Sequence, residues 1–197
     1  ITTVRLIDQP GELRLPDTFF SRFVDAPRSW LEEASMPSQP LHRWDSRVFA
    51  ADITLVEAVI PVIYGDPAAM ADGISALSES TDANEPTIRL PIDIFGSAFL
   101  MLSRYEEVVR PDRDEHDRFP AWASLAFQEG FLDRPIIDEY TEILWAAMQR
   151  LWPQLERRRH TFQIHVSHDV DRPARYQFVS GRRFLRALGG DILKRRA

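Results

Sequence analysis

Apolar and polar side chains alternate most clearly over residues 162–167, which read Phe-Gln-Ile-His-Val-Ser. A period of two is typical of a strand that has one face against a core. Pro173 follows shortly afterwards, and proline cannot donate to a strand ladder. We therefore expect a strand that begins near Phe162 and ends at or just after Asp169.

Two longer stretches have the period of an α-helix. The first follows a capping residue, Asp93, and ends at Pro111, and its apolar positions are Phe95, Phe99, Leu102, Tyr105 and Val109. The second begins after Pro135 and ends at Trp152, and its apolar stripe consists of Ile136, Tyr140, Ile143, Ala147 and Leu151. Both stretches predict helices that bury one face.

Shorter β-rich runs complete the pattern. Strands are predicted over residues 2–7, 53–64 and 87–90, and Pro61 places the second of them at a sheet edge or divides it. Two passages that begin at Arg14 and Arg89 share a strand-proline-helix order, which a duplicated half-domain would explain. The predicted fold is α/β. A small mixed sheet flanked by helices occupies residues 1–160, and residues 161–197 begin a second domain.

Composition narrows the classes of function. The 197 residues include no cysteine, so any metal must be held by His, Asp, Glu or water. No apolar run reaches about 18 residues, which argues against a membrane span. The net charge of −6 argues against nucleic acid as the main partner. A cytoplasmic location is favoured, although the chain begins at Ile1 without a methionine and a signal peptide could have been lost.

The C-terminal residues are an exception to the acidic balance. Residues 182–197 carry six basic side chains and one acidic side chain. We interpret this run as the basic face of a helix, and a phosphate-binding or membrane-binding patch is the alternative.

Candidate chemistry gathers where the strand of residues 162–169 is predicted to end. His168, Asp169 and Asp171 stand together there, and the ends of strands carry the active sites of parallel α/β sheets and barrels. One carboxylate can hold a divalent metal while the other accepts a proton from water. The same residues could instead form a polar turn that caps the next element.

The stretch of residues 165–173, His-Val-Ser-His-Asp-Val-Asp-Arg-Pro, resembles the first motif of polysaccharide deacetylases, the carbohydrate esterase family 4 group. Stretches beginning at Asp93, Arg118 and Arg134 resemble the uncharacterised α/β region that precedes the deacetylase domain in some bacterial proteins. The resemblance implies that Asp169 is the catalytic base and that Asp171 is a ligand of a divalent metal, most simply zinc. It also implies that residues 161–197 begin a deacetylase-type barrel.

The implied activity is hydrolysis of an N-acetyl amide on a sugar or glycan. The metal-binding His-x-x-x-His pair of these enzymes does not occur in the sequence, so we expect the chain alone to be inactive. The exposed edge of an incomplete barrel also invites pairing, which makes a homo-oligomer an expectation.

Other candidates belong to different classes. The charged run of residues 110–119 could gather Asp114, His116 and Asp117 around a ligand, or it could be a solvated connection. Residues 1–160 could form a non-catalytic module that binds a glycan or a partner domain, with Trp44 or Trp122 stacking on a sugar. A third interpretation is that residues 1–160 form a purely structural cap on the following domain.

Overall fold

A computed structural model describes residues 1–25, 30–50, 52–71, 86–158, 161–167 and 180–194. The chain divides into two compact units, Ile1–Glu156 and Arg157–Ala197. Each unit is described by itself below.

The first unit is a mixed α/β fold with two small sheets. The strands are β1 (Thr2–Val4), β2 (Glu12–Leu15), β3 (His42–Asp45), β4 (Val59–Val62) and β5 (Thr87–Arg89). Strand β2 is central in the first sheet, antiparallel to β1 and parallel to β5, and β3 pairs with β4 in an antiparallel second sheet. The predicted mixed sheet is thus confirmed, and a separate two-stranded sheet accompanies it.

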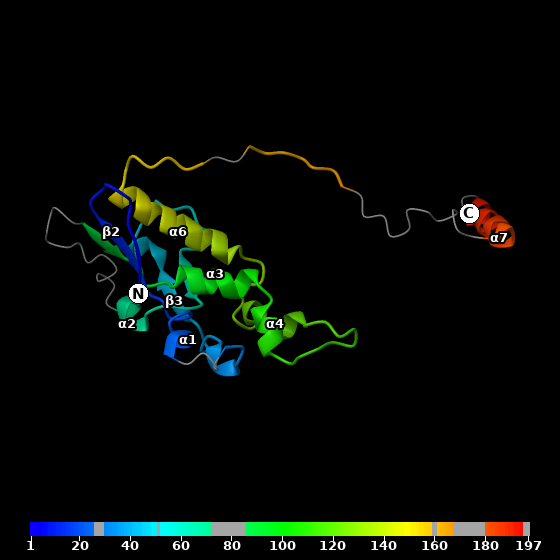
Figure 1. Cartoon of the computed structure of the whole chain (residues 1–197), viewed down its shortest axis with the longest axis horizontal. Helices are drawn as coiled ribbons and strands as arrows, with labels where there is room; N and C mark the ends of the chain where they lie inside the picture. The colour runs from blue at the N-terminus through cyan, green and yellow to red at the C-terminus, as the bar shows by residue number, and fades with distance from the viewer. Residues whose placement is uncertain (26–29, 51, 72–85, 159–160, 168–179, 195–197) are drawn as a thin grey trace. The chain divides into compact units, whose positions relative to one another are not determined.

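Helices surround these sheets in Figure 1. The α-helices of this unit are α1 (Arg22–Asp25), α2 (Pro67–Ala71), α3 (Ile94–Leu102), α4 (Tyr105–Val109), α5 (Leu125–Gln128) and α6 (Ile136–Leu151). Short 3-10 turns are η2 (Glu33–Ser35), η3 (Ser46–Val48) and η5 (Ala121–Ala123). Helix α6 packs against β2, β5 and α3, so it joins the first sheet to the helical layer.

Helix α6 confirms its predicted stripe. Ile136, Tyr140, Ile143 and Ala147 are buried, and the helix ends at Leu151 beside the buried Trp152. The Tyr140 hydroxyl donates to the Pro61 carbonyl oxygen at 2.6 Å and accepts from the Ile63 amide at 3.1 Å. A residue of the helix therefore satisfies two buried backbone groups at the end of β4.

The predicted helix between Asp93 and Pro111 is divided in two. Asp93 caps α3 as predicted, but Ser103 has an extended backbone and a second helix, α4, begins at Tyr105. The break turns Tyr105 into the core, where its hydroxyl donates to Ser35 Oγ at 2.8 Å. The predicted apolar face of α3 is only partly correct. Phe99 packs against the core, but Phe95 and Leu102 are 43% and 76% exposed, and the buried leucine is Leu100.

The two passages with the strand-proline-helix order lie side by side. Strands β2 and β5 pair in parallel, with Arg14 opposite Arg89. The Asp93 carboxylate then serves both passages: one oxygen accepts from the amides of Thr18 and Phe19, at 2.8 and 2.9 Å, and the other accepts from Gly96 at 2.9 Å. This buried carboxylate ties the two chain turns together.

One strand prediction is correct only in part, and another fails over the residues that the structure describes. Within residues 53–64, only Val59–Val62 form a strand. Residues 161–167 form neither helix nor strand, and the alternating Phe162, Ile164 and Val166 are 90%, 75% and 79% exposed. A strand needs a partner for its backbone groups, and no residue in the described ranges pairs with this stretch. No closed barrel is formed by the described residues.

The second unit contains helix α7 (Gly181–Lys194). Arg182, Arg183 and Arg186 are exposed along it, together with Leu185. The predicted basic helix is thus confirmed as a helix. None of the helices in the described part of the chain is long and apolar enough to cross a bilayer.

Candidate functional site

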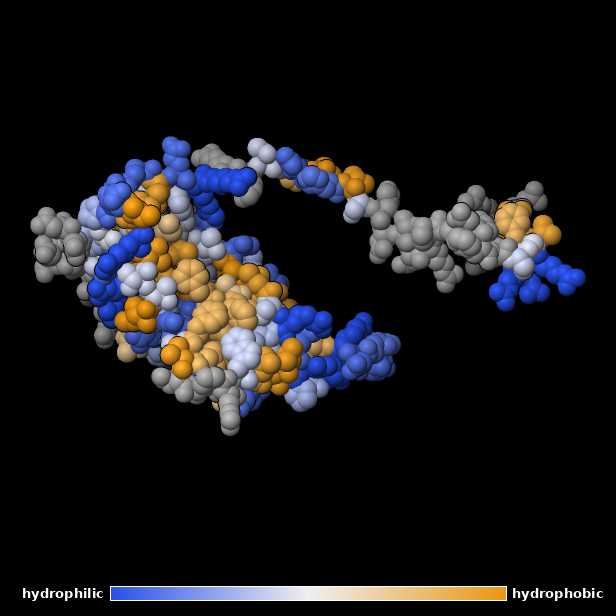
Figure 2. All heavy atoms as spheres, viewed as in Figure 1, coloured by the Kyte–Doolittle hydropathy of each residue, from blue (hydrophilic) through white to orange (hydrophobic). Residues whose placement is uncertain are grey.

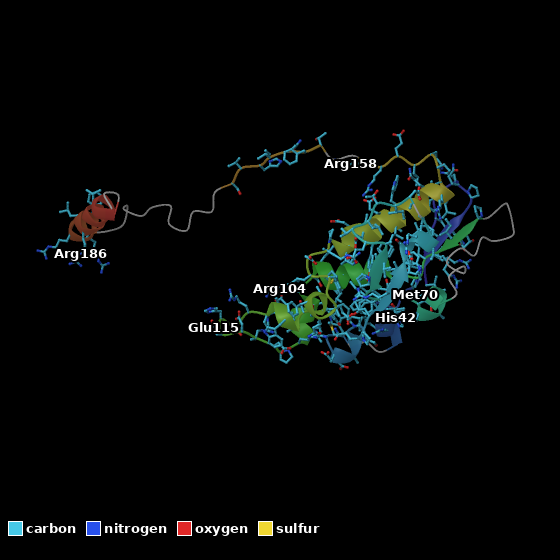
Figure 3. The ribbon with its side chains drawn as sticks, turned by 180° about the vertical axis from the view of Figure 1, so that it is seen from behind. His42, Met70, Arg104, Glu115, Arg158 and Arg186 are labelled. Carbon is cyan, nitrogen blue, oxygen red and sulfur yellow. The ribbon has the colours of Figure 1, made fainter. Side chains whose placement is uncertain are left out.

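A cavity of about 220 Å³ lies among α1, α2 and the second sheet. Figure 3 shows His42 and Met70, which contribute to it from β3 and α2. Its described lining combines polar and apolar groups, namely Thr18, Arg22, Pro37, Ser38, His42, Val62, Ile63, Tyr64, Gly65, Pro67 and Met70. Concave sites of this mixed kind are where small ligands bind.

The segment that follows β4 forms one wall of the cavity. Tyr64 is 3% exposed, its amide donates to Ser97 Oγ at 3.3 Å, and its hydroxyl donates to the Ser35 carbonyl oxygen at 2.7 Å. Burial raises the pKa of the Tyr64 hydroxyl far above its usual value, so the hydroxyl stays a neutral donor. This wall is therefore held in place by hydrogen bonds from both ends of one residue.

Arg22 is the fixed charge in the described lining. Its guanidinium lies 5.6 Å from the centre of the Tyr64 ring, a cation-π distance. Its Nη1 donates to the carbonyl oxygens of Ala34 and Ser35 at 3.3 and 3.4 Å. Among the described residues, no carboxylate pairs with Arg22.

Thr18, Ser38 and His42 add hydrogen-bonding groups to this lining. The position of Thr18 is fixed by Asp93, because the Thr18 amide and hydroxyl both donate to the Asp93 carboxylate, at 2.8 and 3.3 Å. None of the described lining residues is a carboxylate. The cavity therefore offers a cation, hydroxyl groups and an imidazole beside an apolar wall.

The sequence did not indicate these residues as a site. They are spread from Thr18 to Met70, and they do not form a motif of known chemistry. His42 carried no signal of its own, since the other histidines lie far away in the sequence. Only the pairing of β3 with β4 and the position of α1 bring them together.

The residues predicted to be catalytic belong to the second unit. His168, Asp169 and Asp171 are outside the described residues. His165 is described and exposed, and its Nε2 lies 3.2 Å from Gln163 Oε1. The assigned roles of these aspartates stay predictions.

The loop that holds His116 is organised as a turn. The Asp114 carboxylate accepts from the amides of His116 and Arg118, at 2.8 and 2.9 Å, and pairs with the Arg118 guanidinium. Hydrogen bonds from Arg118 and His116 lower the pKa of Asp114. Within the described ranges no three His, Asp or Glu side chains converge as metal ligands, here or elsewhere. This arrangement matches the solvated-connection interpretation of the loop.

The two tryptophans considered for sugar binding differ in exposure. Trp44 is 4% exposed and its ring lies 6.5 Å from that of Phe49, so its proposed stacking role is wrong. Trp122 is 58% exposed on η5, and Gln128 Nε2 donates to its carbonyl oxygen at 3.4 Å. Trp122 thus remains available for a flat ligand.

Comparison with known protein families gives a match over most of the chain. Residues 24–153 match the model of DUF7033, a family of unknown function. The chain belongs to this family. The DUF7033 segment lies inside the first unit and contains His42, Tyr64 and Met70 from the cavity, whereas the Asp169-Val-Asp171 motif lies outside it. No curated protein and no solved structure matches the chain.

Proposed function

We propose that the first unit, which carries the DUF7033 segment, is a non-catalytic module that binds a small sugar-like ligand in the cavity beside Tyr64. The observation that supports this most directly is the cavity lining, which places hydroxyl groups and an imidazole beside an apolar wall. A sugar ring likewise combines polar and apolar surface, since it carries hydroxyl groups around its edge and C–H groups on its faces. The volume of about 220 Å³ is below the range of drug-sized pockets, which suits a single ring.

The test is a two-dimensional NMR titration of the chain with N-acetylglucosamine. We expect amide shifts concentrated at residues 62–65 and near Ser38. A Ser38→Trp variant should block the cavity and abolish the shifts, because Ser38 is exposed and a larger side chain there need not enter the core. Val108→Trp is the matched control, since Val108 is 62% exposed and lies outside the cavity. Shifts that persist in Ser38→Trp would place binding elsewhere.

The second part of the proposal is that this module belongs to a metal-dependent sugar N-deacetylase. Its support is the resemblance of residues 165–173 to the first deacetylase motif. In that role Asp171 would hold a divalent metal, zinc in the first instance, and Asp169 would accept a proton from water. Carboxylate oxygens are suitable ligands for such an ion, which would supply Lewis-acid chemistry when bound.

Zinc titration by calorimetry tests the role of Asp171. We expect the parent chain to bind zinc weakly, because Asp171 is its one predicted ligand, and Asp171→Ala to weaken that binding further. Asp133→Ala is the control, because Asp133 is exposed and lies in the first unit. Equal affinity in all three proteins would favour the interpretation of Asp169-Val-Asp171 as a polar turn.

We also expect the chain alone to release no acetate from acetylated glycans, and metal-dependent release would contradict this.

Trp122 supports a second way of binding glycans. Its ring is 58% exposed, and indole rings stack on the apolar faces of sugars. Trp122→Ala should weaken the binding of N-acetylglucosamine oligosaccharides while the melting temperature stays unchanged. Phe95→Ala is the matched control, since Phe95 is 43% exposed on a different helix. Equal affinities for the two variants would exclude Trp122.

A further inference from the structure

Arg22 differs from most arginines of the first unit in its partners. Eight arginines of the described residues there pair with a carboxylate, namely Arg5, Arg14, Arg43, Arg47, Arg104, Arg110, Arg118 and Arg134. Arg22 contacts only backbone carbonyl oxygens and the Tyr64 ring among the described residues. It is also the arginine that lines the cavity.

The contacts of Arg22 leave part of its guanidinium available. Its Nη1 is shared between Ala34 and Ser35, while its Nε and Nη2 have no hydrogen-bond partner in the described part of the chain. Guanidinium groups bind carboxylates and phosphates through two parallel N–H groups. The contacts with the Tyr64 ring and the two carbonyl groups favour a defined orientation, so less entropy is lost when an anion binds.

The groups around Arg22 suit an anion attached to a ring. The described lining contains no carboxylate that could neutralise Arg22 or repel an anion. Thr18, Ser38 and His42 can bind hydroxyl groups, and Val62, Pro67 and Met70 contribute apolar surface. A free inorganic anion would leave that apolar surface unused.

We propose that the cavity binds a small anionic sugar, and that Arg22 binds its carboxylate or phosphate group. This inference rests on the proposed binding module and specifies its ligand. Arg22 would act as the residue that selects charged over neutral sugars.

The test is a calorimetric or NMR titration with glucose, glucuronate and glucose 6-phosphate. The three share one ring and differ at the exocyclic carbon, so the comparison isolates the charge. We expect one of the two anions to bind about tenfold or more tightly than glucose, the effect of charge-assisted hydrogen bonds. The preferred anion identifies the source of the negative charge.

Arg22→Gln should remove this preference and leave weak binding of glucose. Arg113→Gln is the matched control, because the Arg113 guanidinium also contacts backbone carbonyl oxygens in the described residues but lies outside the cavity. Melting temperatures of both variants establish that each is folded.

The possible failures are distinguishable. Equal binding of glucose and both anions, unchanged in Arg22→Gln, would overturn the selection of anions and leave the binding module standing. Absence of binding by any sugar, including N-acetylglucosamine, would overturn both proposals.

Discussion

The Asp93 side chain joins two parts of the first unit that lie far apart in the sequence. It is 2% exposed, and its two oxygens accept hydrogen bonds from the backbone of Thr18, Phe19 and Gly96. Its role as a helix cap follows from sequence, because Asp precedes an apolar helical run. Its contact with residues 18–19 does not, since 75 positions separate Thr18 from Asp93.

Asp93→Ala should therefore be strongly destabilising. Removing the carboxylate leaves buried amides without acceptors, and we expect a loss of about 3 kcal/mol or more in the free energy of unfolding. Asp45→Ala is the control, because Asp45 caps the short turn η3 through the Arg47 amide and pairs with the exposed Arg47 guanidinium. Its cost should be about 1 kcal/mol or less. Equal losses in urea denaturation would show that Asp93 acts only as a local cap.

Glu12 gives a prediction about pH. The hydrogen bond from Arg5, together with the nearby Arg14, lowers the pKa of the Glu12 carboxyl below its ordinary value of 4.5. The unfolded chain then binds more protons than the folded chain at about pH 4. The stabilisation by Glu12 is present above pH 4.5 and is lost as the pH falls toward the lowered pKa.

Glu12→Gln should reduce the loss of stability that occurs as the pH falls below about 4.5. We expect the melting temperature of the variant to be lower than that of the parent at pH 7, and the difference to shrink below pH 4.5. Thermal unfolding between pH 3 and pH 7 provides the measurement. A constant difference over that range would show that Glu12 acts through packing rather than charge.

At the scale of elements, helix α3 shows the limits of periodicity. Figure 2 shows apolar residues gathered on the face that α3 and α4 present, and these helices include the exposed Phe95, Leu102 and Val108. Helix α3 carries no charged residue, so spacing alone could not identify its buried side. Helix α6 has Asp138 and Glu142 opposite its apolar stripe, and there the predicted stripe was confirmed. Glu139 is buried beside that stripe.

The two leucines of α3 provide a matched test of this orientation. Leu100 is 2% exposed and Leu102 is 76% exposed. Leu100→Ala should cost about 3 kcal/mol, because it leaves a cavity in the core. Leu102→Ala should change stability by less than about 0.5 kcal/mol. The reverse order in chemical denaturation would restore the face that the sequence predicted.

The sequence could predict features that depend on neighbouring residues, but not features that depend on tertiary packing. Periodicity located helices and short strands because each depends on neighbours along the chain. The cavity depends on Thr18, His42 and Met70, which only tertiary packing unites. The ion pair between Arg134 and Glu139, at 2.8 Å and nearly buried, was also not predicted, because the spacing of the two residues gives no sign that packing buries them.

At the scale of the whole molecule, the core determines where the chain can be cut. Among the residues that the structure describes, every buried member of the core cluster precedes Arg157, and the last of them is Trp152. The Trp152 side chain is 2% exposed, and its indole nitrogen donates to the Pro10 carbonyl oxygen at 2.9 Å. The two ends of the first unit are thus connected through one residue.

Two shortened chains test this organisation. A chain of residues 1–156 should unfold cooperatively within about 2 °C of the parent, because it retains the whole core and stability changes of about 1 kcal/mol shift proteins of this size by a few degrees. A chain of residues 1–150 should be destabilised by about 3 kcal/mol or more, because it lacks Trp152 and exposes the surface that Trp152 covers. Calorimetry of the three chains provides the comparison. If the chain of residues 1–156 melted far below the parent, residues 157–197 would have to stabilise the first unit, and the proposal of an independent binding module would lose its basis.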